Sequence, residues 1–75
     1  MDINPARFRA QTWLAEHEVE LLGRSAGEAR TLIERAGLHV RVFRGETAWA
    51  TQDLAYERVN IWLGEDERVT RAWAG

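Results

Sequence analysis

Two short stretches of this sequence alternate apolar and polar residues, and a longer segment without that period separates them. The stretches read LHVRVF (38–43) and RVNIWL (58–63), which is the period of a strand with one buried face. The 14 residues between them show neither steady alternation nor a helical stripe. Loops of more than about 12 residues are uncommon in compact domains and are usually functional or disordered. The chain is therefore expected to fold around a sheet that carries one long, exposed loop.

The apolar residues of this loop argue against disorder. Trp49, Leu54 and Tyr56 provide hydrophobic anchors that a solvated coil lacks. Loops that are held by a rigid scaffold are where binding residues concentrate. The segment is therefore a candidate binding element.

A first helix is expected at the N-terminus. Asn4 is a suitable N-cap, and Pro5 fits the first helical position because its missing N–H costs nothing there. Five apolar residues recur at the spacing of one helix face: Ile3, Ala6, Ala10, Trp13 and Leu14. We expect a helix over about 5–16. We expect this face to dock on the domain's own core, with self-association or a partner helix as the alternative. The following EVELLG (18–23) reads as an extended connector.

The main helix is the clearest local signal. Ser25 and Glu28 have the spacing of a capping box, in which each side chain bonds the other's backbone N–H. Gly37 is placed to end the helix in a left-handed turn. Beyond the second strand, GEDE (64–67) predicts a turn, and RVTRAW (68–73) predicts a third strand that forms a hairpin with the second.

Three aromatic side chains fall off the predicted core faces. Phe8 lies off the stripe of the first helix and is expected to be exposed. Phe43 and Trp62 alternate out of the buried face of their strands. Either the first helix covers Phe43 and Trp62, or they leave an apolar patch that marks a contact surface.

Composition argues against several functional classes. The 75 residues include no cysteine, so no disulfide supports the fold. This fits a reducing compartment or indifference to redox state. All ten basic residues are arginines scattered among twelve acidic ones, which does not make the one-signed patch that nucleic acid needs. No apolar run approaches the roughly 20 residues of a membrane span. No signal-peptide pattern is visible, so we expect a cytoplasmic protein.

Catalysis and metal binding are not expected either. A hydrolase needs an activated nucleophile, but the only serine, Ser25, is already explained as a helix cap. His17 and His39 lack the spacing of a metal site, which needs three or four convergent ligands. The residues therefore predict no enzyme, no cofactor and no metal.

The order of motifs resembles the potato inhibitor I family of serine-protease inhibitors, the type of eglin and the barley chymotrypsin inhibitor. The similar motifs are ELLGRSAGEAR (20–30), TQDLAYERVNIW (51–62) and the terminal AWAG (72–75). ERVN (57–60) also resembles the related bacterial inhibitors, and Ala74 stands where those proteins have a cysteine. The resemblance covers about three quarters of the chain, from Glu20 onward.

This resemblance, with the predicted elements, implies an α+β fold. One main helix packs on a small three-stranded mixed sheet, the long loop joins the first two strands, and the N-terminal helix is an addition. We expect a single domain over 1–75, in which 1–18 is the helical extension and 19–75 the inhibitor-like core.

The resemblance also implies a function. Such an inhibitor offers a rigid, substrate-like loop, here about 47–56, to a subtilisin-like serine protease. By position, Thr51, Gln52, Asp53 and Leu54 match the segment that binds the protease. The target bond then lies between Gln52 and Asp53, and Gln52 fills the main specificity pocket.

The resemblance further implies how the loop is supported. Thr51 and Asp53 match residues that brace the loop against the strand beneath, where Arg58 and Asn60 stand. Alternation places Arg58 and Asn60 on the same strand face. A charge-assisted Asp53–Arg58 contact would order the loop before the protease arrives, since arginine offers a rigid fork of donors. Tyr56 and Trp49 are expected to anchor the shoulders of the loop; the alternative is that Arg58 is an ordinary surface arginine.

Some residues depart from the family pattern. The family has a large apolar residue where Gln52 stands, and it has an arginine where Ala55 stands. The extra helix has no clear family counterpart. These departures favour an alternative, a non-inhibitory interaction domain on the same fold. One form of this alternative is a homodimer through the first helix and Trp62.

Overall fold

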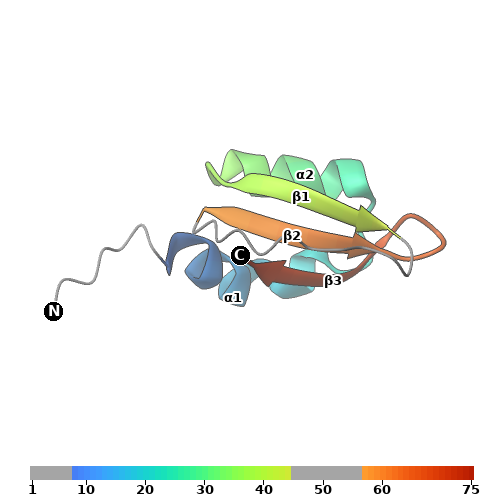
Figure 1. Cartoon of the computed structure of the whole chain (residues 1–75), viewed down its shortest axis with the longest axis horizontal. Helices are drawn as coiled ribbons and strands as arrows, with labels where there is room; N and C mark the ends of the chain where they lie inside the picture. Colours follow the sequence, from blue (N-terminus) through green and yellow to red (C-terminus); the bar gives the residue numbers. More distant parts are fainter. Residues whose placement is uncertain (1–7, 45–56) are drawn as a thin grey trace, which may run out of the picture.

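The computed structural model describes residues 8–44 and 57–75 (Figure 1). Its elements are α1 (Arg9–Leu21), α2 (Ala26–Arg35), β1 (His39–Arg44), β2 (Arg58–Leu63) and β3 (Val69–Ala74). The sheet order is β1-β2-β3; β1 and β2 are parallel, and β2 and β3 are antiparallel. The α+β fold with a mixed three-stranded sheet is therefore confirmed, including the terminal hairpin.

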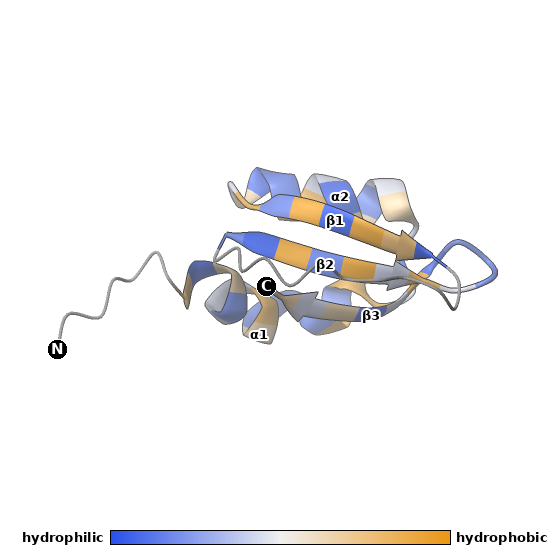
Figure 2. Ribbon diagram, viewed as in Figure 1, coloured by the Kyte–Doolittle hydropathy of each residue, from blue (hydrophilic) through white to orange (hydrophobic). Residues whose placement is uncertain are grey.

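The core lies between the sheet and the two helices. Figure 2 shows apolar and polar residues alternating along β1 and β2, as expected for strands that bury one face. Each helix contributes a buried stripe that packs against this face. The buried apolar residues are Ala10, Leu14, Leu21, Ala29, Ile33, Leu38, Val59, Ile61, Leu63 and Val69.

Ser25 caps the start of α2, as predicted. The Ser25 hydroxyl accepts a hydrogen bond from the Glu28 backbone N–H at 3.2 Å and donates to the Glu28 carboxylate at 3.0 Å. The Ser25 hydroxyl, followed by the Ser25 backbone, lowers the pKa of Glu28 below its ordinary value of 4.5. Gly37 follows the helix at φ +77°, a conformation that favours glycine.

The predicted extent of α1, about 5–16, is wrong at both ends. The helix begins at Arg9, and its N-cap, Phe8, makes no side-chain hydrogen bond. The stretch after residue 16 is not an extended connector, because the helix continues to Leu21. Leu21 is fully buried and shares a face with Ala10 and Leu14, so burial favours the extra turn. Val19 is 85% exposed and lies off this face, so the sequence of this turn did not indicate that the helix continues. The predicted cap at Asn4 lies outside the described residues.

The apolar face of α1 packs against the sheet. Ala10 and Leu14 join the core, with Trp13 packed against it, and α1 contacts β3 and β2. The expectation that this face docks on the domain's own core is confirmed. Phe8 is 42% exposed, also as expected. Neither described helix is long and apolar enough to span a membrane.

Candidate functional site

The sheet has a second face that points away from the buried core. Val59, Ile61 and Leu63 of β2 are buried in the core, so the residues between them point to the other side. Their register partners in β1 and β3 point the same way. We call this surface, together with Arg58 at the start of β2, the site face. It comprises Arg41, Phe43, Arg58, Asn60, Trp62, Arg71 and Trp73.

Asn60 lies at the centre of the site face and is fully buried. Its Oδ1 accepts a hydrogen bond from Arg41 Nε at 2.8 Å. Its Nδ2 donates to the backbone oxygens of Gly75 at 2.9 Å and Trp73 at 3.4 Å. A buried amide is costly unless its donors and acceptor are satisfied. Asn60 meets this condition by joining β1, β2 and the end of the chain at one point.

Arg58 is held beside Asn60 at the start of β2. Its Nε donates to the Gly75 backbone oxygen at 2.8 Å, and the Gly75 N–H donates to the Arg58 carbonyl at 3.1 Å. The Gly75 oxygen therefore accepts from both Arg58 and Asn60. Arg58 is half-buried, and its guanidinium is held by the backbone at the end of the chain.

Stacked aromatic rings occupy the part of the site face that lies away from Arg58. The Phe43 ring stacks on Trp73, with centroids 5.5 Å apart, and on Trp62, with centroids 6.2 Å apart. The Arg41 guanidinium lies 4.9 Å from the Phe43 ring centroid, within range of a cation–π contact. The helix α1 packs against the core face instead of covering Phe43 and Trp62. These two rings instead form a half-buried cluster with Trp73.

The strand ends that flank the predicted loop lie at opposite ends of the sheet. In the parallel register Arg44 is beside Leu63, whereas His39 is beside Arg58. Five steps of about 3.3 Å separate these levels, or roughly 17 Å. Twelve extended residues reach about 40 Å, so the intervening sequence is longer than this crossing requires.

The extra helix contributes a contact at the start of β2. Arg9 Nη2 donates to the Ala36 carbonyl at 2.7 Å, and Arg9 Nη1 lies 3.8 Å from the Glu57 carboxylate. A Cβ at Gly37 would come within 2.6 Å of Arg9 Nη2, so the missing side chain leaves room for the guanidinium. The backbone N–H of His39 also donates to the Glu57 carbonyl, at 2.7 Å. Arg9 therefore connects α1 to the residue that immediately precedes Arg58.

The predicted protease-binding residues lie outside the described residues; they are Thr51, Gln52, Asp53 and Leu54. The same holds for the predicted anchors Trp49 and Tyr56. The Asp53–Arg58 contact remains a prediction for the same reason. Within 8–44 and 57–75, no group of three His, Asp or Glu side chains is arranged to hold a metal ion.

Sequence reasoning missed three members of the Asn60 network. Arg41 and Trp73 become partners of Asn60 only through the strand register, and Gly75 reaches it through the end of β3. Alternation already placed Arg41 on the outward face of its strand. The parallel alignment that brings it to Asn60 has no comparable signal in a single sequence.

The chain is similar in structure to solved protease inhibitors. No protein-family model matches the chain, and no curated protein sequence matches it. The bitter gourd trypsin inhibitor is similar in structure, with a TM-score of 0.64 and 27% identity over 75% of this chain and 85% of that one. The elastase inhibitor AFUEI has a TM-score of 0.65 and 16% identity over 89% and 96% of the two chains. The chain thus has the fold of known protease inhibitors.

Proposed function

We propose that this protein is a serine-protease inhibitor of the potato inhibitor I type, which presents residues of about 47–56 as a rigid, substrate-like loop. One observation carries the proposal most directly: Arg58 and the buried Asn60 are fixed on the strand that directly follows this segment. The proposal is also supported by the fold, which is similar to that of two solved protease inhibitors.

The mechanism depends on order that exists before the protease binds. A flexible peptide loses conformational entropy when it enters a cleft, whereas a loop that is already ordered avoids most of that cost. A rigid loop also keeps the new chain ends together after cleavage, so that resynthesis of the bond competes with release. A slow, tight complex then forms in place of ordinary turnover.

The roles of the loop residues follow from their positions in the sequence. Gln52 would enter the main specificity pocket, and the bond between Gln52 and Asp53 would lie at the catalytic serine. Asp53 would pair with Arg58, whose place on the site face is fixed by the Gly75 backbone. Thr51 and Leu54 would add contacts on either side, and the aromatic Trp49 and Tyr56 would anchor the two shoulders of the loop.

The target we propose is a subtilisin-like protease. Gln52 has no positive charge for a trypsin-like pocket and no large apolar surface for a chymotrypsin-like one. The structural neighbours are inhibitors of trypsin and of elastase, so both enzymes belong in the same panel.

A titration of the purified protein against subtilisin, elastase and trypsin tests the proposal. We expect stoichiometric inhibition of subtilisin at submicromolar concentration and slow cleavage between Gln52 and Asp53. Absence of inhibition of all three enzymes at micromolar concentration would refute it. Rapid cleavage at that bond without a persistent complex would refute it equally.

A second candidate is a non-inhibitory interaction domain that associates through α1. The observation that favours it is the exposure of Val19 at 85% and of Phe8 and Leu22 at 42% each, all on or beside that helix. Sedimentation equilibrium distinguishes a dimer from a monomer. A monomer at all concentrations would remove the homodimeric form of this candidate.

A further inference from the structure

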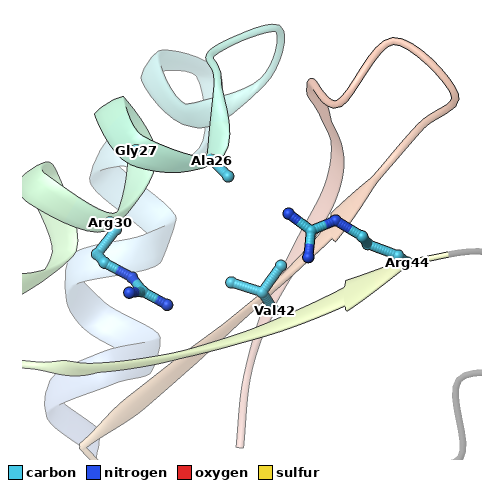
Figure 3. Close-up of a pocket in the computed structure, with 5 residues that line it drawn as sticks. All are labelled: Ala26, Gly27, Arg30, Val42 and Arg44. Atoms are coloured by element: carbon cyan, nitrogen blue, oxygen red, sulfur yellow. The ribbon is translucent and has the colours of Figure 1, made fainter.

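A small pocket lies between the start of α2 and the end of β1, within the described part of the chain (Figure 3). Its volume is about 230 Å³. Figure 3 shows Arg30, from α2, and Arg44, from β1, extending toward the same gap above Val42. The lining residues are Ala26, Gly27, Arg30, Val42 and Arg44.

The charges around this pocket are unbalanced. Arg44 Nε donates to the Glu67 carboxylate at 2.9 Å, which leaves the terminal nitrogens of Arg44 for another acceptor. The Arg30 guanidinium makes no hydrogen bond or ion pair within residues 8–44 and 57–75. Glu28, near the same helix start, is already engaged by Ser25 and Arg24. Two guanidinium groups therefore face the gap, and one carboxylate offsets them.

The walls of the pocket leave room for a ligand beside these charges. A Cβ built at Gly27 would meet no atom within 4 Å, so that wall is open space. The side chains of Val42 and Ala26 are apolar, so neither side chain competes with a ligand for the two arginines. Arginine presents N–H donors in a planar fork that fits oxyanions, and charge-assisted hydrogen bonds are the strong ones.

We infer that this pocket binds a small, doubly charged oxyanion of the phosphate class, held between Arg30 and Arg44. Two cations and a small volume favour a compact dianion over a monoanion. The site does not use the residues of the proposed inhibitory loop, so its occupancy does not depend on whether the protein inhibits a protease.

Backbone amide NMR of the full chain tests this inference, with inorganic phosphate as the probe at pH 8 and constant ionic strength. We expect saturable shifts at Ala26 and Gly27 with phosphate and weaker binding of acetate. Non-saturable shifts, or equal binding of acetate, would overturn it. Constant ionic strength is essential because exposed charges respond to salt in general.

Matched variants separate the pocket from general electrostatics. Arg30→Ala should weaken phosphate binding roughly tenfold. Arg35→Ala removes the same charge from the last turn of the same helix and should leave binding unchanged. Glu67→Gln frees Arg44 from its carboxylate partner and should strengthen binding several-fold. Equal losses in Arg30→Ala and Arg35→Ala, or weaker binding in Glu67→Gln, would contradict the assignment.

Discussion

Arg41 and Asn60 face each other across the parallel strands β1 and β2, and Arg41 Nε donates to Asn60 Oδ1 at 2.8 Å. The same amide donates to the Gly75 backbone oxygen, which also accepts from Arg58. This single buried side chain therefore connects the strand before the proposed loop, the strand after it and the end of the chain. These hydrogen bonds would hold the two strands that flank the proposed inhibitory loop in fixed positions.

Asn60→Ala should destabilise the fold by about 2 kcal/mol. The substitution removes an acceptor of Arg41 Nε and the amide that donates to two backbone oxygens, and hydrogen bonds lost by buried groups cost roughly 1–3 kcal/mol. Urea unfolding, followed by tryptophan fluorescence, measures the change. Glu16→Ala, at an exposed site of α1, is the control and should stay within about 0.5 kcal/mol of the wild type. A similar loss in both variants would show that the Asn60 network adds little.

Arg58→Ala should weaken protease binding by roughly tenfold to a hundredfold and speed cleavage of the loop, if the proposed function holds. The guanidinium is fixed by Gly75 and stands on the first residue of β2. Loss of preorganisation appears mostly as faster dissociation. Inhibition kinetics with subtilisin measure both effects, with Arg35→Ala as the charge-matched control. Unchanged inhibition in Arg58→Ala would exclude Arg58 as a support of the loop.

Gln52→Leu should increase affinity for a subtilisin-like protease by about tenfold or more. An apolar side chain gains roughly 1–3 kcal/mol when it fills a hydrophobic pocket. Gln11→Leu makes the same chemical change on the exposed surface of α1 and should have no effect on inhibition. If Gln52→Leu and wild type inhibit equally, position 52 does not enter the specificity pocket.

Alternation and the Ser25 cap were enough to predict the strands and the start of α2. The period of 58–63 separated Val59 and Ile61 from Arg58 and Asn60, and the structure places the first pair in the core. Both features act within a few residues along the chain, so a single sequence displays them. The limits of the third strand, expected over 68–73 and found at Val69–Ala74, were therefore close.

Features that depend on distant partners were not predictable in the same way. The last turn of α1 is stabilised by burial of Leu21 under the sheet, which the polar residues around it conceal. The Arg41–Asn60 bond requires the parallel register of two strands that the loop separates. Tertiary contacts of this kind override local propensity, and they leave no periodic trace in the residues themselves.

Ser25→Ala should lower stability by about 1 kcal/mol near neutral pH, the usual effect of losing an N-cap. Part of the loss should depend on pH. Ser25 holds the pKa of Glu28 below 4.5, so this contribution is present above the unfolded pKa and disappears as pH falls through the lower folded value. Denaturation of both proteins between pH 7 and pH 2 measures the difference, which should narrow in acid. A difference that is constant over this range would show that Glu28 is not coupled to the cap.

Leu21→Ala tests whether the last turn of α1 belongs to the core. Leu21 is fully buried, and removal of such a side chain costs about 3 kcal/mol through lost burial and the cavity left behind. Val19→Ala, two residues earlier and 85% exposed, should change stability by less than about 0.5 kcal/mol, since alanine also suits a helix better than valine. Urea unfolding of the two variants beside the wild type gives the comparison. Equal, small effects would mean that residues 17–21 form a loosely attached segment.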